Sequence, residues 1–233
     1  MNNTKTDFMA TPILQFPSNI LAIFAHADDE MNAAGTLMKN QDYGGTSKII
    51  CWDGGAENTH RQEEMAEAAK VLNIKYDLLK IPYPDYDKDY WERELDLVQR
   101  IISFKPDVII THRGDDDYHV HHRYLYNIVK NAARKAAVPK DGWLTRGLLL
   151  TENHSLHQEY HVAVDITEYV EKIIEAQSKH KSQNVKNDNF YVDMISKKAE
   201  YRGFQTGCKF AEVFKFEPTP IVGNVFKNKK YAL

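Results

Sequence analysis

Cysteine is scarce in this chain, and the chain also lacks long apolar runs and an excess of positive charge. Two cysteines, Cys51 and Cys208, are too few for a disulfide framework, which favours reduced thiols in a cytoplasmic protein. No run of eighteen or more apolar residues occurs, so no segment is expected to span a membrane. The net charge of -3 argues against the basic surface that nucleic acids or anionic membranes require.

The beginning of the chain lacks the features of a secretory signal. Residues 1–18 contain one lysine but no apolar central stretch, and they are predicted to form a short arm before the first strand. No internal repeat and no linker divides the rest. A length of 233 residues, with 42% apolar and 27% charged residues, therefore predicts an N-terminal arm over 1–18 and one domain over 19–233.

Apolar stretches of strand length alternate with amphipathic helical segments along the chain. In the helical segments apolar residues recur at three- and four-residue spacing, as Leu125, Ile128 and Val129 do. This alternation predicts an α/β, Rossmann-like fold with a mostly parallel sheet and helices on both faces. Strands are expected at residues 19–26, 47–53, 76–81, 107–111, 147–152 and 161–166.

Two clusters of polar residues follow two of these strands. His26 and the carboxylates at 28–30 come after the first strand, and residues 112–123, "HRGDDDYHVHHR", come after the fourth. Three adjacent carboxylates repel one another unless a cation lies near them. Open parallel sheets bind ligands at the carboxyl ends of their strands. We therefore expect the two clusters to meet at one site on that edge of the sheet.

The chemistry of these side chains predicts a metal site. Histidine nitrogens and carboxylate oxygens suit Zn²⁺, with Fe²⁺ and Mn²⁺ as alternatives. The expected ligands of one ion per chain are His26, one carboxylate from 28–30 and one histidine from 119–122, which leaves a coordination position open as in catalytic zinc sites. A second carboxylate beside the ion could then act as a general base. Taken alone, the later cluster is equally well interpreted as a polar loop or a hydrogen-bonded core histidine.

The two clusters also resemble a known family. "AHADDE" (25–30) resembles the AHPDDE signature of the PIG-L/LmbE-like zinc N-deacetylases, and "YHVHHR" (118–123) resembles their HPDHR motif. Further segments at 61–74, 180–183 and 201–214 are similar to family elements in the same order. The resemblance covers roughly residues 19–214. It implies a zinc ion bound by His26, Asp29 and His122.

The resemblance implies further roles around the ion. Asp28 would be the base that activates water, and His119 would steady the tetrahedral oxyanion or protonate the leaving amine. Arg61 would contact the substrate. Independently of the family, Arg61 shares a helical face with Met65, Ala68 and Leu72; the alternative is a solvated arginine at the start of a helix, as most arginines are surface residues.

Two positions depart from the family pattern. Ala27 replaces a proline, which loosens the turn but removes no chemical group. His121 replaces an aspartate, and a neutral histidine cannot raise the basicity of a neighbouring imidazole as a carboxylate does. Either one of the aspartates at 115–117 takes over that role, or His121 itself approaches the metal.

The expected function is hydrolysis of an amide by metal-activated water. The family resemblance alone implies the substrate: the enzyme would remove an acetyl group from an N-acetylated amino sugar, a small-molecule substrate. One alternative is a metal-dependent hydratase acting on an unsaturated carboxylic acid, which the His121 departure keeps open. Another is an inactive metal-binding relative, against which the second carboxylate, Asp28, speaks. The sequence leaves the oligomeric state open, a homo-oligomer included.

Overall fold

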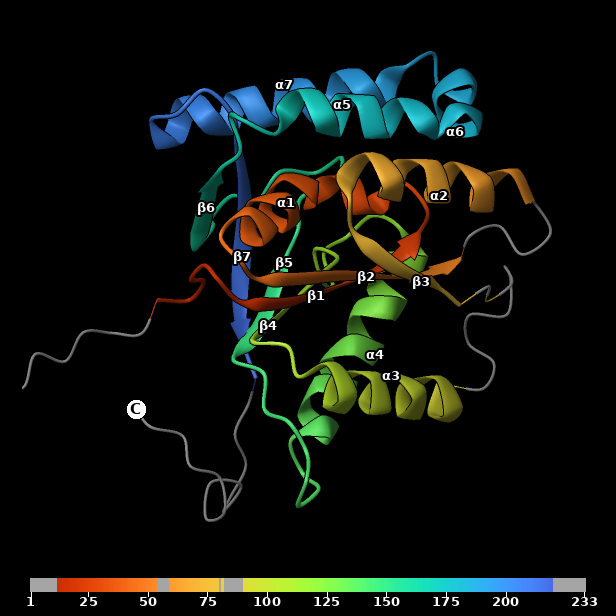
Figure 1. Ribbon diagram of the computed structural model, residues 1–233, viewed down its shortest axis with the longest axis vertical. Helices are drawn as coiled ribbons and strands as arrows, with labels where there is room; N and C mark the ends of the chain where they lie inside the picture. Colours follow the sequence, from red (N-terminus) through yellow and green to blue (C-terminus); the bar gives the residue numbers. More distant parts are fainter. Residues whose placement is uncertain (1–11, 54–58, 80, 82–89, 220–233) are drawn as a thin grey trace, which may run out of the picture.

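The computed structural model describes residues 12–53, 59–79, 81 and 90–219 (Figure 1). Most of the predicted arm over 1–18 lies outside these residues. A 3-10 turn, η1 (Asp29–Asn32), follows the first strand. The strands are β1 (Asn19–His26), β2 (Thr46–Asp53), β3 (Lys75–Leu78), β4 (Val108–Thr111), β5 (Gly147–Leu150), β6 (Val162–Asp165) and β7 (Ala211–Pro218). The helices are α1 (Ala34–Asp42), α2 (Thr59–Leu72), α3 (Tyr90–Phe104), α4 (Val120–Ala136), α5 (Val170–Lys179), α6 (Lys181–Lys186) and α7 (Phe190–Thr206).

The strands form one sheet in the order β3-β2-β1-β4-β5-β7-β6. The pairs among β1 to β5 are all parallel, whereas β7 runs antiparallel to both β5 and β6. The predicted α/β, mostly parallel fold is therefore confirmed. The third strand is shorter than expected and ends at Leu78 instead of residue 81. The edge strand pair contains a strand, β7, that was not anticipated.

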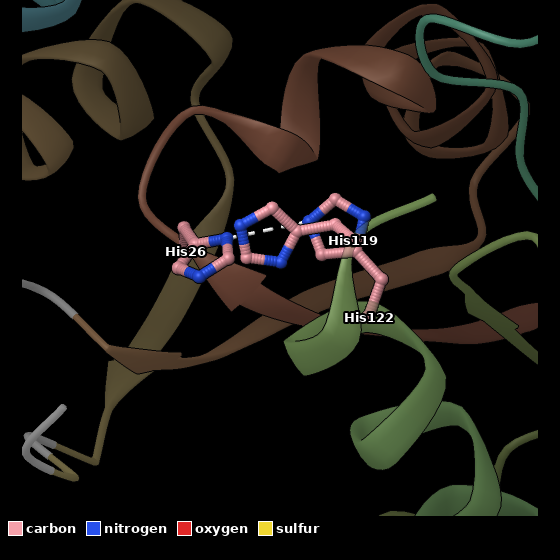
Figure 2. A group of neighbouring side chains, drawn as sticks. All are labelled: His26, His119 and His122. Atoms are coloured by element: carbon pink, nitrogen blue, oxygen red, sulfur yellow. Dashed lines mark hydrogen bonds between the residues drawn. The ribbon is translucent and has the colours of Figure 1, made fainter. Parts of the chain in front are cut away.

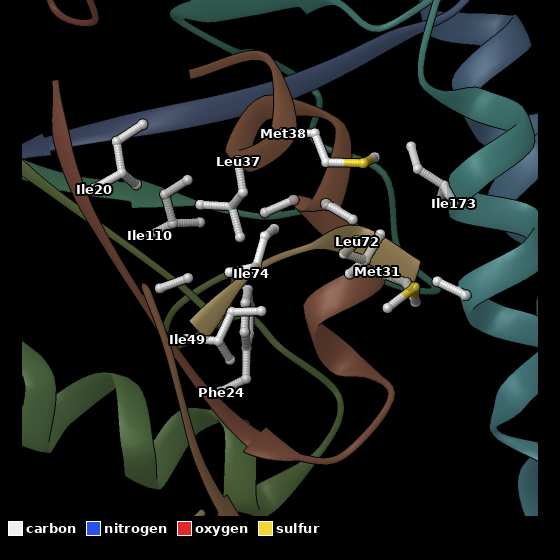
Figure 3. Close-up of a cluster of buried hydrophobic side chains, with 14 of the residues drawn as sticks. Ile20, Phe24, Met31, Leu37, Met38, Ile49, Leu72, Ile74, Ile110 and Ile173 are labelled. Carbon is white, nitrogen blue, oxygen red and sulfur yellow. The ribbon is translucent and has the colours of Figure 1, made fainter. Parts of the chain in front are cut away.

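Helices cover both faces of the sheet (Figure 1). Because side chains alternate along a strand, Ile20, Ala22 and Phe24 of β1 pack on the side of α1, α2, α5 and α7, where Figure 3 shows the apolar cluster. The side chains of Leu21 and Ile23 pack on the other side, against α3 and α4. All residues of β1 between its two ends are buried. The sheet thus has an apolar core on each face that does not involve the polar clusters.

The strand order places the two polar clusters beside each other. From β1 the chain moves outward through β2 and β3, and it then returns to form β4 on the opposite side of β1. The connections leaving β1 and β4 therefore diverge at the carboxyl ends of these neighbouring strands, which is the position where open parallel sheets bind ligands. His26 is the last residue of β1, and His112 follows β4 directly. Among the described residues, no helix is long and apolar enough to cross a bilayer.

Candidate metal centre

The three adjacent carboxylates after β1 point to three different partners. One oxygen of Asp29 lies 3.1 Å from Nδ1 of His26. Asp28 contacts Arg61, with 3.2 Å between Oδ1 and Nη2. Glu30 is buried and lies 2.8 Å from Nε2 of the buried His180. The repulsion expected among three neighbouring charges is relieved because each carboxylate has its own cationic or imidazole partner.

Three atoms from the two clusters converge on one point. Nδ1 of His26, Oδ2 of Asp29 and Nε2 of His122 are separated by 3.1, 3.3 and 3.4 Å. Bonds of about 2.0–2.1 Å in a tetrahedral zinc site imply ligand atoms about 3.3–3.4 Å apart. The spacing and the chemistry of this donor set therefore fit a divalent cation such as zinc, with a fourth position left for another ligand.

Two related groups of side chains also lie close enough to hold an ion. One consists of His26, His119 and His122, and the other of Asp29, His112 and His122. Nε2 of His112 accepts a hydrogen bond of 2.8 Å from the backbone N–H of Ala25, so its lone pair is already used. The His112 ring instead stacks on the ring of His122, with 3.9 Å between the centroids. His112 therefore fixes the orientation of His122 rather than adding a ligand.

A buried carboxylate contacts the His122 ring on the side that faces away from the site. Nδ1 of His122 lies 3.1 Å from Oδ2 of Asp117, and Asn153 donates a hydrogen bond of 2.6 Å to the same oxygen. Burial disfavours the charged imidazole, but Asp29 and Asp117 outweigh it and raise the pKa of His122 to about 10. Asp117 is thus the aspartate from 115–117 that supports a histidine. Its carboxylate contacts the ring of His122. From His119 it accepts a hydrogen bond from the backbone N–H, at 2.9 Å, and not from the ring.

His121 lies on the outer side of His26. Its Nδ1 is 3.0 Å from Nε2 of His26, whereas Nδ1 of His26 faces Asp29 and His122. When Nδ1 of His26 offers its lone pair to an ion, Nε2 carries the proton and donates a hydrogen bond to Nδ1 of His121. The departure from the family pattern therefore places a neutral acceptor behind a candidate ligand.

Asp28 is positioned at the site through its backbone and its side chain. Its φ of 110° lies in the left-handed region, which is strained for a residue with a side chain. The backbone N–H of Asp28 donates a hydrogen bond of 2.7 Å to Oε2 of Glu30, the residue that pairs with His180. Burial raises the pKa of the Asp28 carboxyl to about 7; the charge of Asp29 adds to the rise, and Arg61 opposes it. A carboxylate with a pKa near neutrality suits general-base work.

His119 is the residue that caps α4. Its Nδ1 accepts a hydrogen bond of 3.2 Å from the backbone N–H of His121, so its proton is on Nε2. Burial lowers the pKa of His119 to about 4, and the nearby His26 and His122 contribute to this shift. The ring lies beside His26, with 4.9 Å between the centroids (Figure 2). His119 is therefore a neutral N–H donor at the site.

The structure brings all the residues predicted from the sequence into one place. His26, Asp29 and His122 face one another, and Asp28, Arg61 and His119 surround them, although their roles stay predictions. Sequence reasoning assigned no function to His112 and Asn153, and it included Glu30 and Asp117 only as members of the groups 28–30 and 115–117. Glu30, His112 and Asp117 stand inside the two polar clusters, so their chemistry was visible; Asn153 had no signal in the sequence.

Comparison with known proteins agrees with this arrangement. The family model described as "PIG-L: GlcNAc-PI de-N-acetylase" matches residues 21–133, which include both polar clusters. The predicted resemblance is therefore confirmed over this range. No curated protein sequence matches the chain.

Solved structures share the fold at low sequence identity. N,N'-diacetylchitobiose deacetylase from Pyrococcus horikoshii has a TM-score of 0.73 and 21% identity, over 87% of this chain and 85% of that chain. A conserved protein from Thermus thermophilus has a TM-score of 0.75 and 21% identity, over 89% and 98%. The 4-carboxy-2-hydroxymuconate hydratase GalB from Pseudomonas putida KT2440 has a TM-score of 0.74 and 17% identity, over 88% and 98%. One fold thus carries two reaction classes.

Proposed function

Because residues 21–133 match the PIG-L family, we propose that this protein is a zinc-dependent N-deacetylase acting on an N-acetylated amino sugar. One observation carries the proposal. The donor atoms of His26, Asp29 and His122 lie 3.1–3.4 Å apart, and a second carboxylate, Asp28, stands next to them in the chain. A purely structural metal site has no use for that second carboxylate. The family match and the deacetylase among the structural neighbours support the reaction, and the amino sugar is the class of substrate that their names contain.

The three converging side chains would hold the ion. A bound zinc ion supplies Lewis-acid polarisation of a carbonyl group and makes water a stronger acid. Asp117 orients the ring of His122 so that its Nε2 points toward the proposed ion. His121 does the same for Nδ1 of His26. Fe²⁺ and Mn²⁺ remain compatible with the same donors.

Asp28 would remove the proton from the attacking water. The water oxygen forms a bond to the amide carbon, and its proton moves to the Asp28 carboxylate. The Arg61 guanidinium, which contacts both Asp28 and the carbonyl oxygen of Ala27, keeps that carboxylate in place. As the activity requires ionised Asp28, kcat/KM should fall as the pH is lowered through the pKa of this carboxyl group, which lies near 7 without the metal and lower beside a cation.

His119 would stabilise the negative charge that develops on the carbonyl oxygen. Its Nε2–H is free to point at the oxygen that becomes negatively charged in the tetrahedral intermediate. When the C–N bond breaks, the amine nitrogen gains a proton, which the protonated Asp28 can donate, while the neutral His119 donates only a hydrogen bond. Acetate and the free amino sugar are the products.

Acetate release tests this function directly. Purified protein loaded with zinc should release acetate from members of a panel of N-acetylated amino sugars, and Asp28→Asn should lower kcat by about a hundredfold or more. Absence of acetate with every sugar would contradict the proposal. The Asp28→Asn variant also serves as the control for contaminating deacetylases.

A hydratase is the second candidate because a hydratase shares the fold over most of both chains. The neutral His121 behind His26 distinguishes this metal site from one supported by a carboxylate. The same protein should therefore be assayed for water addition to unsaturated dicarboxylates by the loss of their ultraviolet absorbance. Turnover of these acids without acetate release would assign the hydratase reaction.

We place the protein in the cytoplasm. Within the described residues, neither the buried Cys51 nor the half-buried Cys208 forms a disulfide, as expected in a reducing compartment. Fractionation of cells with an antibody against the protein checks this placement.

A further inference from the structure

Four aromatic rings gather beside the metal centre. They are Tyr118 before α4, His154 in the segment between β5 and β6, and Phe190 and Tyr191 at the start of α7. His154 lies at the middle: its ring is perpendicular to Tyr118 at 5.1 Å and parallel to Phe190 at 5.8 Å. The three segments are far apart in the sequence, so the fold assembles this group. We call it the aromatic cluster.

The aromatic cluster lies at the protein surface, although large aromatic side chains are usually buried. Tyr118 is 55% exposed and Phe190 is 50% exposed, and His154 is also on the surface. The hydroxyl group of Tyr118 lies 2.8 Å from Nδ1 of His154, so these two rings are held in place by a hydrogen bond. Ordered, exposed aromatic faces present an apolar surface with fixed geometry, which is a common property of binding sites.

The cluster is continuous with the catalytic side chains. The Tyr118 ring is 5.9 Å from the ring of His119 and 6.3 Å from that of His122, measured between centroids. Burial raises the pKa of Tyr191, and the charges of Asp28 and Asp29 add to the rise, so this phenol lies within electrostatic range of the two carboxylates. A molecule that reacts at the metal centre and extends beyond it toward these rings must therefore contact the cluster.

We propose that the aromatic cluster binds a second sugar ring, adjacent to the N-acetylated sugar that occupies the metal centre. The inference rests on the proposed deacetylase function and deepens it, since it makes an oligosaccharide or glycoside the preferred substrate. A pyranose has an apolar C–H face, which stacks on the negative face of an aromatic ring, and a rim of hydroxyl groups. The cluster offers matching surfaces: the solvent-exposed parts of the stacked Phe190 and His154 rings, and the phenol groups of Tyr118 and Tyr191.

The chemistry of the cluster favours a neutral sugar ring. Burial and the nearby Lys198 lower the pKa of His154, so its ring is uncharged at neutral pH, like the other three rings. Two of the four rings carry hydroxyl groups, which a purely apolar acyl chain could not use. An N-acyl chain longer than acetyl is therefore the competing occupant that the experiment has to distinguish.

Binding can be measured apart from turnover. In the zinc-loaded Asp28→Asn protein, calorimetry should give a Kd for a β-linked N-acetylglucosamine disaccharide about 3- to 10-fold lower than for the monosaccharide, the scale of one aromatic contact. Phe190→Ala should remove this preference and leave the monosaccharide Kd unchanged. Tyr118→Ala should act in the same direction. Both side chains are about half exposed, so neither change should unfold the protein.

Phe204→Ala is the matched control. Phe204 lies at the other end of the same helix, α7, and is 86% exposed, so its removal should change neither Kd. Equal binding of the two sugars, a preference that survives Phe190→Ala, or tighter binding of an N-octanoyl monosaccharide than of the disaccharide would overturn the proposal. Failure of the deacetylase function would appear separately, as absence of acetate from the wild-type protein while the Phe190-dependent sugar binding persists.

Discussion

The two segments that build the candidate metal centre hold their side chains in different ways. After β1, the contact between His26 and Asp29 spans three residues, and the backbone N–H of His26 also donates to Asp29 at 2.9 Å. After β4, His122 is oriented by Asp117, which is held in turn by Asn153, 36 residues away in the sequence. One half of the site is therefore local, and the other half depends on the fold.

This difference indicates where the site is vulnerable. A change behind the local half leaves the pair His26 and Asp29 together, because their contacts lie within one turn of the chain. A change at Asp117, which does not itself contact the proposed ion, should allow the ring of His122 to move without altering any ligand atom. The following experiments test this contrast, beginning with the largest expected effect.

Removal of the metal should abolish activity and leave the fold intact. The apolar cores on the two faces of the sheet do not include the site, so folding does not require the ion, unlike in a zinc finger. After chelation, turnover should fall to background while the far-ultraviolet circular dichroism stays unchanged, and added zinc should restore turnover. Full activity of protein shown to be metal-free would refute the metal-dependent mechanism.

Asp117→Asn should weaken metal binding by about 10- to 100-fold, the usual effect of removing a partner behind a ligand. The amide keeps the size of the side chain but loses the charge that faces Nδ1 of His122. Asp115→Asn is the matched control, because Asp115 is exposed and contacts Asn127 on the helix surface. Competition with a fluorescent zinc chelator gives both affinities. Equal affinities would show that metal binding by His122 does not depend on the Asp117 carboxylate.

Metal binding should release about one proton at neutral pH. The pKa of His122 near 10 means that this ring is protonated in the metal-free protein below about pH 10, and a ligand nitrogen has to lose its proton. The apparent affinity should therefore rise by up to about tenfold per pH unit over the neutral range and level off as the pH passes through this pKa. Calorimetry in buffers with different ionisation enthalpies counts the protons. A count of zero would contradict the pairing of His122 with Asp29 and Asp117.

The smallest change in metal affinity is expected for a substitution at His121, the residue that contacts His26. His121→Asp places a carboxylate where Nε2 of His26 now has a neutral acceptor, which should make His26 more basic and tighten metal binding. The gain should be smaller than the loss caused by Asp117→Asn, because the contact of His26 with Asp29 already fixes the ring. The same chelator competition measures it. Looser binding would show that His121 supports the site better than a carboxylate does.

Local patterns were sufficient to predict most of the fold. The six predicted strands exist because each is an apolar run between polar segments, and β1 has nearly the predicted burial throughout. The strand β7 escaped notice because Glu212 interrupts its apolar run. This glutamate is buried, and its carboxylate accepts hydrogen bonds of 2.8 Å from the backbone N–H groups of Gly35 and Thr36, at the start of α1. No local pattern shows a contact across 177 residues.

The same limit applies to the candidate site. His26, Asp29 and His122 could be named because their motifs are short and placed after adjacent strands. The role of Asn153 depends on where β5 ends relative to α4, and the pairing of Glu30 with His180 joins residues 150 positions apart. Such contacts become visible only in three dimensions, and they decide which carboxylate faces which partner.

The most direct test of the account compares the neighbours Asp28 and Asp29, one proposed as base and the other as ligand. Metal content by mass spectrometry and turnover should be measured on Asp28→Asn and Asp29→Asn in parallel. We predict that Asp28→Asn retains about one metal ion per chain and loses turnover by at least about a hundredfold, whereas Asp29→Asn loses the metal itself. Equal loss of metal in both variants, or full activity in both, would contradict this division of roles.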